Sequence, residues 1–588
     1  MRQWTAAVLL VCGGMMGAGG TMAAQTAKAA DADFRTLAAK YFEEAYFKYQ
    51  PTQGTMDGLH KYDAQLEDFS RAGIDAETAA LHKFADEFDA VPMAPLNQPT
   101  QGDLQMVRNQ IASRLLTLET IRPWQKDPDH YSSDLTNSAF VLMERKFAPA
   151  NERLRSLIAR EKLMPADLQA ARVNLSNPAQ ISTEIALEQL PGIIGFFEHD
   201  VPSAFTDATD PSLKAEFKRT NAAVIAALVS YQHWLKADLL PRSHGDFRLG
   251  ADTFAKKLKY DEMVDTPLDK LVEIAYADMH KNQAEFERIA KEVDPSKTPK
   301  EVLAELATIH PAPDHLLQSF QDTFNGLIGF IQQKHIITIP SDVRPTLEET
   351  PPFMRATTQA SMDPPGPFET HSKTAYFNVT LPERTWSAEH IAEHMSAFNV
   401  GTIVSTSVHE AYPGHYVQFL WVNNAALSQV RKIINANTNV EGWAHYCEQM
   451  MLEEGYGQPG TGAKDAREAK LIRLGQLQDA LLRDARFVVS IKLHTGQMSF
   501  DDAAKFFVTD GYQSPSVGLV ETKRGTSDPT YLYYTLGKLE IMKLRADVEK
   551  KEGKDFSLQK FHDDFMRQGG APIKIVRRAF LGDNSPTL

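Results

Sequence analysis

Residues 466–493 read A-R-E-A-K-L-I-R-L-G-Q-L-Q-D-A-L-L-R-D-A-R-F-V-V-S-I-K-L, with apolar side chains at intervals of three and four residues. This spacing is typical of an amphipathic α-helix. The same period recurs over residues 104–118, 213–239 and 268–293. Clusters of proline and glycine, such as those at 191–192, 295–299 and 311–313, separate the helical segments. The sequence therefore predicts a mainly α-helical protein.

Signals for β-structure are few. Residues 335–340 (H-I-I-T-I-P) and 374–381 (T-A-Y-F-N-V-T-L) are the best short strands, so we expect a small β-sheet. A proline-rich seam runs from residue 344 to residue 367. It suggests an N-terminal helical half over residues 31–350 and a C-terminal half over residues 351–588. Without a long linker between them, we expect the two halves to form one continuous unit.

The composition excludes several classes of protein. Of the 588 residues, 43% are hydrophobic and 23% are charged, as in an ordinary globular protein. The net charge of -14 leaves no basic footprint for nucleic acid, so no nucleic-acid partner is expected. The two cysteines, Cys12 and Cys447, are too few for a disulfide framework.

The N-terminus predicts export. Arg2 precedes a short apolar stretch, and small residues follow it, which is the layout of a signal peptide over residues 1–24 with cleavage near Ala24. The apolar stretch is too short for a transmembrane anchor, and no later segment reaches the required length. Val11 stands before Cys12 where a lipoprotein signal needs a small residue, so lipidation is not expected. We expect a periplasmic or secreted protein without an integral membrane segment.

The chemistry concentrates in residues 405–418, which read S-T-S-V-H-E-A-Y-P-G-H-Y-V-Q. Histidines are common zinc ligands, and a glutamate next to one of them can act as general base on water. His409 and His415 are six residues apart, whereas the usual motif has its histidines at i and i+4. On a continuous helix, six residues would leave the side chains roughly 120° apart and about 9 Å displaced along the axis. Pro413 and Gly414 can interrupt the helix and bring the histidines together.

A second run, N-V-E-G-W-A-H-Y-C-E over residues 439–448, offers a third ligand. Glu441, His445 and Glu448 follow one another at i, i+4 and i+7 and so share one helical face. A carboxylate at Glu441 would complete a set of two histidines and one glutamate, with His445 and Glu448 orienting the ligands from behind. A kinked buried helix with hydrogen-bonded histidines, or a charged solvent-facing helix, would show similar residues. Trp443 and the neighbouring methionines disfavour the solvent-facing alternative.

The pair H-E-A-Y-P-G-H-Y and E-G-W-A-H-Y-C-E resembles the two motifs of an exported bacterial family catalogued as a domain of unknown function. That family is similar to the helical zincins: angiotensin-converting enzyme, the thimet oligopeptidase group and the Taq carboxypeptidase group. The resemblance implies a large helical bowl with a small sheet near the active site. It also implies that Glu441 is the third zinc ligand and Glu410 the general base. His445 departs from the pattern, since we expect an apolar residue there, and this leaves open whether His445 or Glu448 replaces a ligand.

The same resemblance suggests roles for residues outside the two motifs. The run D-P-T-Y-L-Y-Y-T-L-G-K over residues 528–538 is expected to open a helix, with Tyr531 and Tyr534 on one face. By resemblance, Tyr534 would donate to the oxyanion and Tyr531 would contact substrate, although an aromatic core stripe would look alike. The strand at 374–381, which contains Asn378, would be an edge strand that pairs with peptide. Weaker candidates near the site are His371, His494, Glu521, Arg524 and Lys538, of which Arg524 or Lys538 would take a substrate carboxylate.

We therefore expect a zinc metallopeptidase-like hydrolase with one Zn²⁺ per chain, acting on short peptides or peptide-like amides. His409, His415 and Glu441 would hold the ion, and Glu410 and Tyr534 would be catalytic. Tyr531, Arg524, Asn378 and His494 would contact substrate. Two other classes stay open: a zinc hydrolase of a non-peptide amide or ester, and an inactive metal-binding scaffold or receptor.

Overall fold

The computed structural model describes residues 16–350, 355, 359–383 and 386–588, which are mainly helical. Helices make up 70% of the chain and strands 3%, which confirms the expected fold class with its small sheet. Residues 1–15 of the predicted signal peptide, including Cys12, lie outside the described residues, as do Pro351 and Pro352 of the seam. No helix in the described part of the chain is long and apolar enough to span a membrane.

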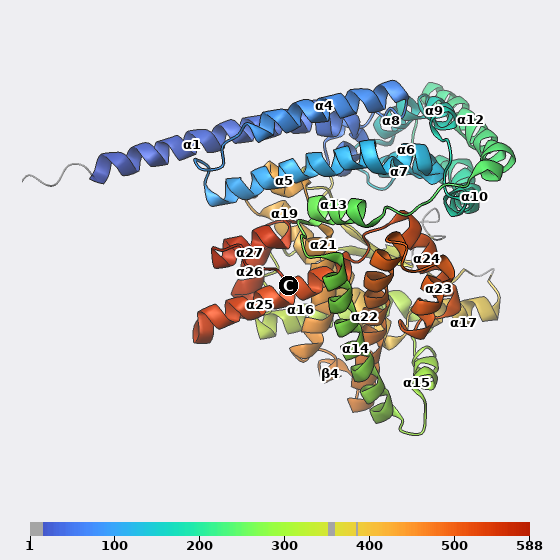
Figure 1. Ribbon diagram of the computed structural model, residues 1–588. Coiled ribbons are helices and arrows are strands. Elements are labelled where there is room, and N and C mark those ends of the chain that lie inside the picture. Colours follow the sequence, from blue (N-terminus) through green and yellow to red (C-terminus); the bar gives the residue numbers. More distant parts are fainter. Residues whose placement is uncertain (1–15, 351–354, 356–358, 384–385) are drawn as a thin grey trace, which may run out of the picture.

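Helices of the N-terminal part form an upper layer in Figure 1, with the first half of α1 extending away from the molecule. These helices are α1 (Met16–Tyr41), α2 (Phe47–Tyr49), α3 (Pro51–Met56), α4 (Arg71–Asp89), α5 (Gln98–Leu115), α6 (Pro123–Lys126), α7 (Pro128–Met143), α8 (Ala150–Glu161), α9 (Met164–Asn174), α10 (Gln180–Gly195), α11 (Val201–Ala204) and α12 (Pro211–Trp234).

The remaining helices lie mostly below this layer, with α13 next to it and α14 running beside α22. They are α13 (Ala251–Glu262), α14 (Leu268–Val293), α15 (Pro299–Leu306), α16 (Leu316–Lys334), α17 (Ala388–Ser396), α18 (Val400–Thr406), α19 (His415–Asn424), α20 (Gln429–Ile433), α21 (Asn437–Glu453), α22 (Ala466–His494), α23 (Phe500–Thr509), α24 (Pro515–Ser527), α25 (Tyr533–Glu552), α26 (Leu558–Met566) and α27 (Ile573–Leu581).

Short helical turns of 3₁₀ or π geometry connect or extend these elements. Those with π geometry are η1 (Phe42–Tyr46), η3 (Leu116–Ile121), η4 (Phe196–Asp200), η5 (Leu235–Leu239) and η9 (Ser407–Ala411). Those with 3₁₀ geometry are η2 (His60–Tyr62), η6 (Leu240–Arg242), η7 (Pro313–His315) and η10 (Gly553–Asp555). π-turns are frequent at functional sites.

The four long segments with helical periodicity all form helices. Residues 268–293 and 466–493 correspond to α14 and α22, whereas the ends of 104–118 and 213–239 pass into η3 and η5. One large apolar core includes residues from Phe34 to Val576 and so draws on both predicted halves. A second core, from Phe69 to Leu239, belongs to the upper layer. The division at residue 350 stays a prediction.

The small sheet has three strands in the order β1–β3–β2: β1 (Thr346–Glu349), β3 (Tyr376–Val379) and β2 (Ala360–Asp363). The predicted strand at 374–381 is confirmed as β3. Its expected position at the edge was wrong, because β1 pairs with it in parallel on one side and β2 antiparallel on the other. Both rows of backbone hydrogen-bonding groups of β3 are therefore used within the sheet. A further two-stranded sheet joins β4 (Gln458–Pro459) and β5 (Gly462–Ala463).

The strand predicted at residues 335–340 is not a strand. The segment has no regular secondary structure but buries Ile336 and Ile337, which explains its apolar pattern. Its backbone groups bond to side chains instead of to a neighbouring strand. The amide of Thr338 donates to Asp563 over 2.9 Å, and its carbonyl accepts from the indole of Trp421 over 2.9 Å.

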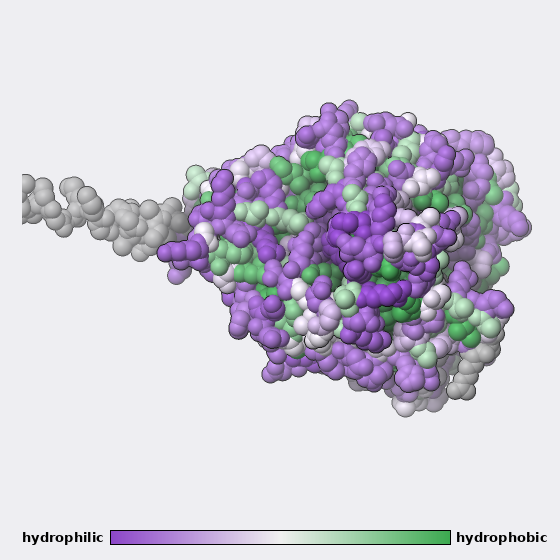
Figure 2. Space-filling view, turned by 90° about the horizontal axis from the view of Figure 1, so that it is seen from below, coloured by the Kyte–Doolittle hydropathy of each residue, from purple (hydrophilic) through white to green (hydrophobic). Residues whose placement is uncertain are grey.

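The face of the molecule shown in Figure 2 is mainly hydrophilic. On the face shown in Figure 2, hydrophobic residues occur in small groups between hydrophilic ones. This face resembles the ordinary surface of a globular protein, on which scattered apolar side chains are normal.

Candidate metal centre

His409 and Glu410 lie in the π-turn η9, which continues α18. The α-helix ends at Thr406 and the π-turn at Ala411, and α19 starts only at His415. Between them the amide of Gly414 donates to the carbonyl of Val408 over 3.0 Å. The predicted interruption of the helix at Pro413 and Gly414 is confirmed.

Gly414 is required by the close approach of the chain to itself. A Cβ atom at this position would lie 1.8 Å from the carbonyl oxygen of His409 and 2.4 Å from that of Val408. Both atoms are backbone, so they cannot rotate away as a side chain can. Only glycine fits the reversal that turns His415 back toward His409.

Three side-chain atoms converge at this reversal. Glu441 Oε2, from α21, lies 3.3 Å from His409 Nε2 and 3.4 Å from His415 Nε2. Ligand atoms placed 2.0–2.1 Å from a tetrahedral zinc ion would lie about 3.3 Å apart. Both separations from Glu441 therefore match this geometry, and the three ligand atoms all lie within 4.8 Å of one another.

The hydrogen bonding of these atoms also fits a metal. Glu441 Oε2 is buried and has no hydrogen-bond partner among the described residues, although two imidazoles lie beside it. A buried carboxylate oxygen without a partner is costly unless a ligand satisfies it. Within the described part of the chain, these three residues are the one group of histidine, cysteine and acidic side chains arranged to hold a metal ion.

Electrostatic attraction between Glu441 and the neighbouring imidazoles shifts the pKa of both Glu441 and His409. Burial alone would raise the pKa of Glu441, but the attraction of His415 and His409 outweighs it and holds the pKa well below its usual range. Burial would likewise lower the pKa of His409, whereas the carboxylates of Glu441 and Glu448 raise it to about 10. A cation bound at the centre would replace the proton that these carboxylates now favour.

Glu448 supports His409 from behind. Its Oε1 accepts from His409 Nδ1 over 2.7 Å, which directs Nε2 toward Glu441. The other oxygen lies 3.3 Å from His445 Nδ1, and Arg483 of α22 forms an ion pair with Oε1 over 3.2 Å. His445 is fully buried on the far side of Glu448, so the structure places it outside the group of converging atoms.

The helix that carries Glu441 is fixed at its start. Glu262, at the end of α13, accepts hydrogen bonds from the backbone amides of Asn437 and Thr438 and from the Thr438 hydroxyl. These are amides of the first turn of α21, which have no partner within the helix. Further along, Gly442 packs directly on Gly537 of α25, where a Cβ atom would lie 2.6 Å from the Gly537 Cα.

This contact between α21 and α25 brings Tyr534 to the site. Its ring stacks beside the His409 ring at 6.4 Å between centroids, and the guanidinium groups of Arg483 and Arg486 lie over it. Burial and the Glu441 carboxylate raise the pKa of Tyr534. The phenol therefore keeps its proton and can donate a hydrogen bond.

Tyr531 was assigned wrongly. The assignment assumed that Tyr531 and Tyr534 share a helical face, but α25 begins only at Tyr533. Tyr531 is fully buried, and its hydroxyl donates to the carbonyl of Glu521. Tyr533, which lies against Tyr534 at 4.9 Å, borders a cavity of about 460 Å³ and is the second tyrosine near the site.

Arg524 is placed near Tyr534. Its positive charge opposes the rise in the pKa of Tyr534, it forms an ion pair with Asp528 over 3.2 Å, and its side chain is 38% exposed. Glu521 is bound instead to both ends of the Arg486 guanidinium, at 2.6 Å and 2.8 Å. Glu521 thereby fixes the arginine that lies over the Tyr534 ring.

Three other candidates have partners outside the group of converging atoms, although His494 lines the same cavity as Tyr533. Lys538 is buried and ion-paired with Asp278 over 2.7 Å, so it cannot take a substrate carboxylate. His494 is almost fully buried, and its Nε2 bonds to the carbonyl of Gly525 over 2.7 Å. His371 packs beside His60, with 6.0 Å between the ring centroids.

Asn378 is also removed from the three converging side chains. It lies on β3 and lines a separate cavity between the sheet and the upper layer. Glu410, in contrast, stays next to His409 and is half-buried, and its carboxylate makes no hydrogen bond or ion pair with the described residues. Arg483 and Tyr533 were missed; the signal for Arg483 was a charged residue within the apolar pattern of α22.

Comparison with known proteins identifies the family to which the chain belongs. Residues 51–580 match the family described as "Bacterial protein of unknown function (DUF885)". The chain belongs to this family, as its two motifs suggested.

Solved structures with the same fold are known. One is a candidate lipoprotein of unknown function from Shewanella oneidensis, 25% identical, with a TM-score of 0.78 over 93% of this chain and 99% of that one. Another is a candidate lipoprotein from Colwellia psychrerythraea, 18% identical, with a TM-score of 0.77 over 93% of this chain and 98% of that one. No curated protein matches the chain.

Proposed function

We propose that this protein is a zinc-dependent hydrolase of peptide bonds in short peptides or peptide-like amides. The proposal rests on one observation above all: His409 Nε2, His415 Nε2 and Glu441 Oε2 converge at the separation that a tetrahedral ion requires. Their side chains are 8%, 11% and 23% exposed, which favours small substrates over folded proteins.

The residues around the centre supply the other parts of the reaction. When bound, zinc supplies Lewis acidity toward water and toward a carbonyl oxygen. Glu410, whose carboxylate has no partner among the described residues, accepts a proton from the attacking water and delivers it to the leaving amine. The Tyr534 hydroxyl donates to the oxygen of the attacked carbonyl as negative charge develops there. Arg524, at the Tyr534 hydroxyl, is available to a substrate carboxylate.

The two glutamates in this mechanism can be separated by experiment. Glu410→Gln should keep one zinc per chain, because it is not a ligand, and lose activity at least 100-fold. Glu441→Gln should lose zinc, since an amide oxygen is a much weaker ligand than a carboxylate. Elemental analysis of the purified proteins, together with hydrolysis of dipeptides, blocked peptides, non-peptide amides and esters, measures both effects.

The outcomes distinguish the alternatives. Turnover of esters or non-peptide amides without any peptide hydrolysis would show that the proposed substrate class is wrong, while the proposed metal site would still hold. Stoichiometric zinc without turnover of any member of the panel would leave a metal-binding scaffold. Zinc retained by Glu441→Gln but lost from Glu448→Gln would overturn the ligand assignment.

We also propose that the protein is exported. The signal-like N-terminus supports this, and the two solved neighbours are described as candidate lipoproteins. That description disagrees with the expectation that Cys12 is not lipidated. Both forms place the protein outside the cytoplasm.

A further inference from the structure

The two faces of the three-stranded sheet differ in character. Side chains alternate between faces along a strand, and directly paired residues share a face. One face carries the apolar side chains of Phe377, Val379 and Met362, and Phe377 packs on Phe320 and Phe324 of α16. The register places the following polar residues on the other face: Glu348, Asn378 and Ser361 in one row, and Thr346, Tyr376 and Asp363 in the next.

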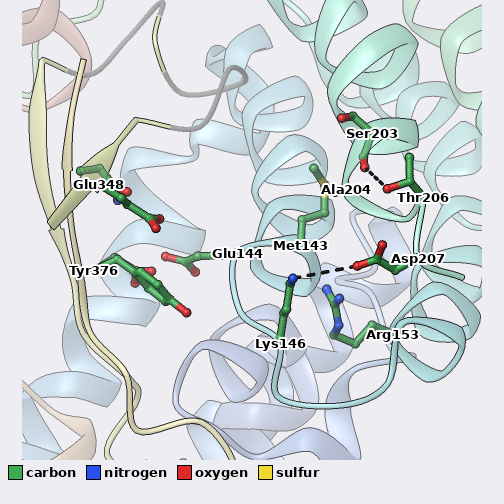
Figure 3. Close-up of a pocket in the computed structure, with 12 residues that line it drawn as sticks. Met143, Glu144, Lys146, Arg153, Ser203, Ala204, Thr206, Asp207, Glu348 and Tyr376 are labelled. Carbon is green, nitrogen blue, oxygen red and sulfur yellow. Dashed lines mark hydrogen bonds and ion pairs between the residues drawn. The ribbon is translucent and has the colours of Figure 1, made fainter. Parts of the chain in front are cut away.

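This polar face borders a cavity of about 300 Å³. Figure 3 shows Glu348 and Tyr376 on the sheet side, with the Glu144 carboxylate reaching toward them from the end of α7. On the opposite wall Lys146 forms an ion pair with Asp207. The metal centre does not contribute to this lining, so the cavity is separate from it.

Negative charge accumulates at the sheet side. Asp363 is ion-paired with Arg145, while Glu348 has no ion pair among the described residues. Burial and the neighbouring Asp363 raise the pKa of Glu144 well above its usual range, and burial and Asp363 also raise that of Glu348. Arg145 is thus ion-paired with Asp363 alone, and Glu144 and Glu348 form no ion pair with the described residues.

A second, independent feature points to a ligand. Asn378 is only 3% exposed, lines the cavity, and its Oδ1 has no hydrogen-bond partner among the described residues. Ser361 Oγ, in the same row of the sheet, is likewise buried and unpaired. Buried polar atoms without partners are rare, because each one costs free energy. Both are acceptors that a hydrogen-bond donor could satisfy.

The spacing decides which kind of cation fits. In the described part of the chain, the acidic side chains here do not bring three oxygens within 4.8 Å of one another, as a bare divalent ion would need. An ammonium group donates hydrogen bonds of about 2.9 Å and carries its own donors, so it tolerates a wider cage. We propose that this cavity binds a ligand through a primary ammonium group held by Glu348, Glu144 and Asn378.

The proposal does not depend on the function of the metal centre. Butylamine serves as the probe for a side-chain-like ammonium, alanine amide for an α-ammonium, and butanol as the neutral control. Binding to the full chain is measured by saturation-transfer NMR and by the shift in Tm. We expect at least one amine to bind and butanol not to bind; the stronger of the two amines identifies the source of the ammonium.

Variants test the site itself. Glu348→Gln should weaken amine binding at least 10-fold, whereas Glu349→Gln should leave it unchanged, because Glu349 faces the other side of the sheet and pairs with Arg355. Asn378→Leu should keep the Tm of the free protein, since its Oδ1 is unpaired, and lose the shift caused by the amine. Equal binding by wild type and Glu348→Gln, saturation by Ca²⁺ alone, or a strongly lowered Tm for Asn378→Leu would each overturn the proposal.

Discussion

Gly414 positions two of the three candidate metal ligands although it is not a ligand itself. Gly414→Ala would place its Cβ against two backbone carbonyls, so the turn must open and His415 must move away from His409. We expect zinc affinity to fall at least 10-fold although all three ligands remain. Competition with a chromophoric chelator measures this loss.

The matched control is Gly329→Ala in α16, where a Cβ meets nothing within 4 Å. It should leave zinc affinity unchanged and raise stability by up to about 1 kcal/mol, because alanine favours a helix over glycine. If Gly414→Ala bound zinc as tightly as Gly329→Ala, the turn would not position the ligand.

Glu448 is expected to act through His409 and not on the ion. Glu448→Gln keeps the shape but weakens the bond to His409 Nδ1 and leaves Arg483 without its carboxylate. Metal affinity should fall 10- to 100-fold, as is typical when a residue that orients a metal ligand is changed. A measurement over several pH values separates this from a structural role, since only altered basicity of His409 shifts the pH at which metal is released.

At the scale of the element, the sequence predicted which segments are helical better than it predicted where each helix begins. The helical period identified α14 and α22, but Tyr531 was misassigned because the four residues after Asp528 form turns before α25 begins. The strands β1 (T-L-E-E) and β2 (A-S-M-D) have little β-propensity, so nothing in their sequence revealed that β3 is central. Tertiary pairing decides such strands.

The cap of α21 predicts a dependence of stability on pH. Burial raises the pKa of Glu262 to about 7, although hydrogen bonds from Thr438 oppose this. The folded state then binds a proton that the unfolded state has released, so the stabilising contribution is complete below about pH 4.5 and is lost as the pH rises through 7. Wild type should lose on the order of 3 kcal/mol from this group between pH 4.5 and 8.

Glu262→Gln removes that titration. Urea unfolding at pH 5 and pH 8 should show a smaller difference in stability for the variant than for wild type. The difference between the two proteins isolates Glu262 from the other titrating groups. Identical pH profiles would mean that the pKa of Glu262 is not raised.

At the scale of the whole molecule, the convergence of His409, His415 and Glu441 was predictable because these residues lie in two short, local motifs. The spacing of His409 and His415, together with the proline and glycine between them, also predicted the break in the helix. Arg483, Arg486 and Glu262 could not be placed in the same way. They reach the site from helices far along the chain, and only packing shows which of many charged residues arrive there.

The N-terminus offers the last prediction. Mass spectrometry of the protein purified from its native envelope should find a mature chain beginning near Gln25, without Cys12. A diacylglyceryl group on Cys12 would instead show that the chain is a lipoprotein, as the two solved structures are described to be. An intact Met1 would contradict export in either form.

The contact between Gly442 and Gly537 has a consequence for how the site can change. The backbones of α21 and α25 are in direct contact there. The distance from the Glu441 carboxylate to the Tyr534 phenol is therefore set by the two backbones and not by bulky side chains. The side chains that surround the centre could therefore be replaced extensively while the distance between Glu441 and Tyr534 stays constant. The same contact prevents small changes in the spacing of the two helices, so a different distance between Glu441 and Tyr534 would require a different backbone.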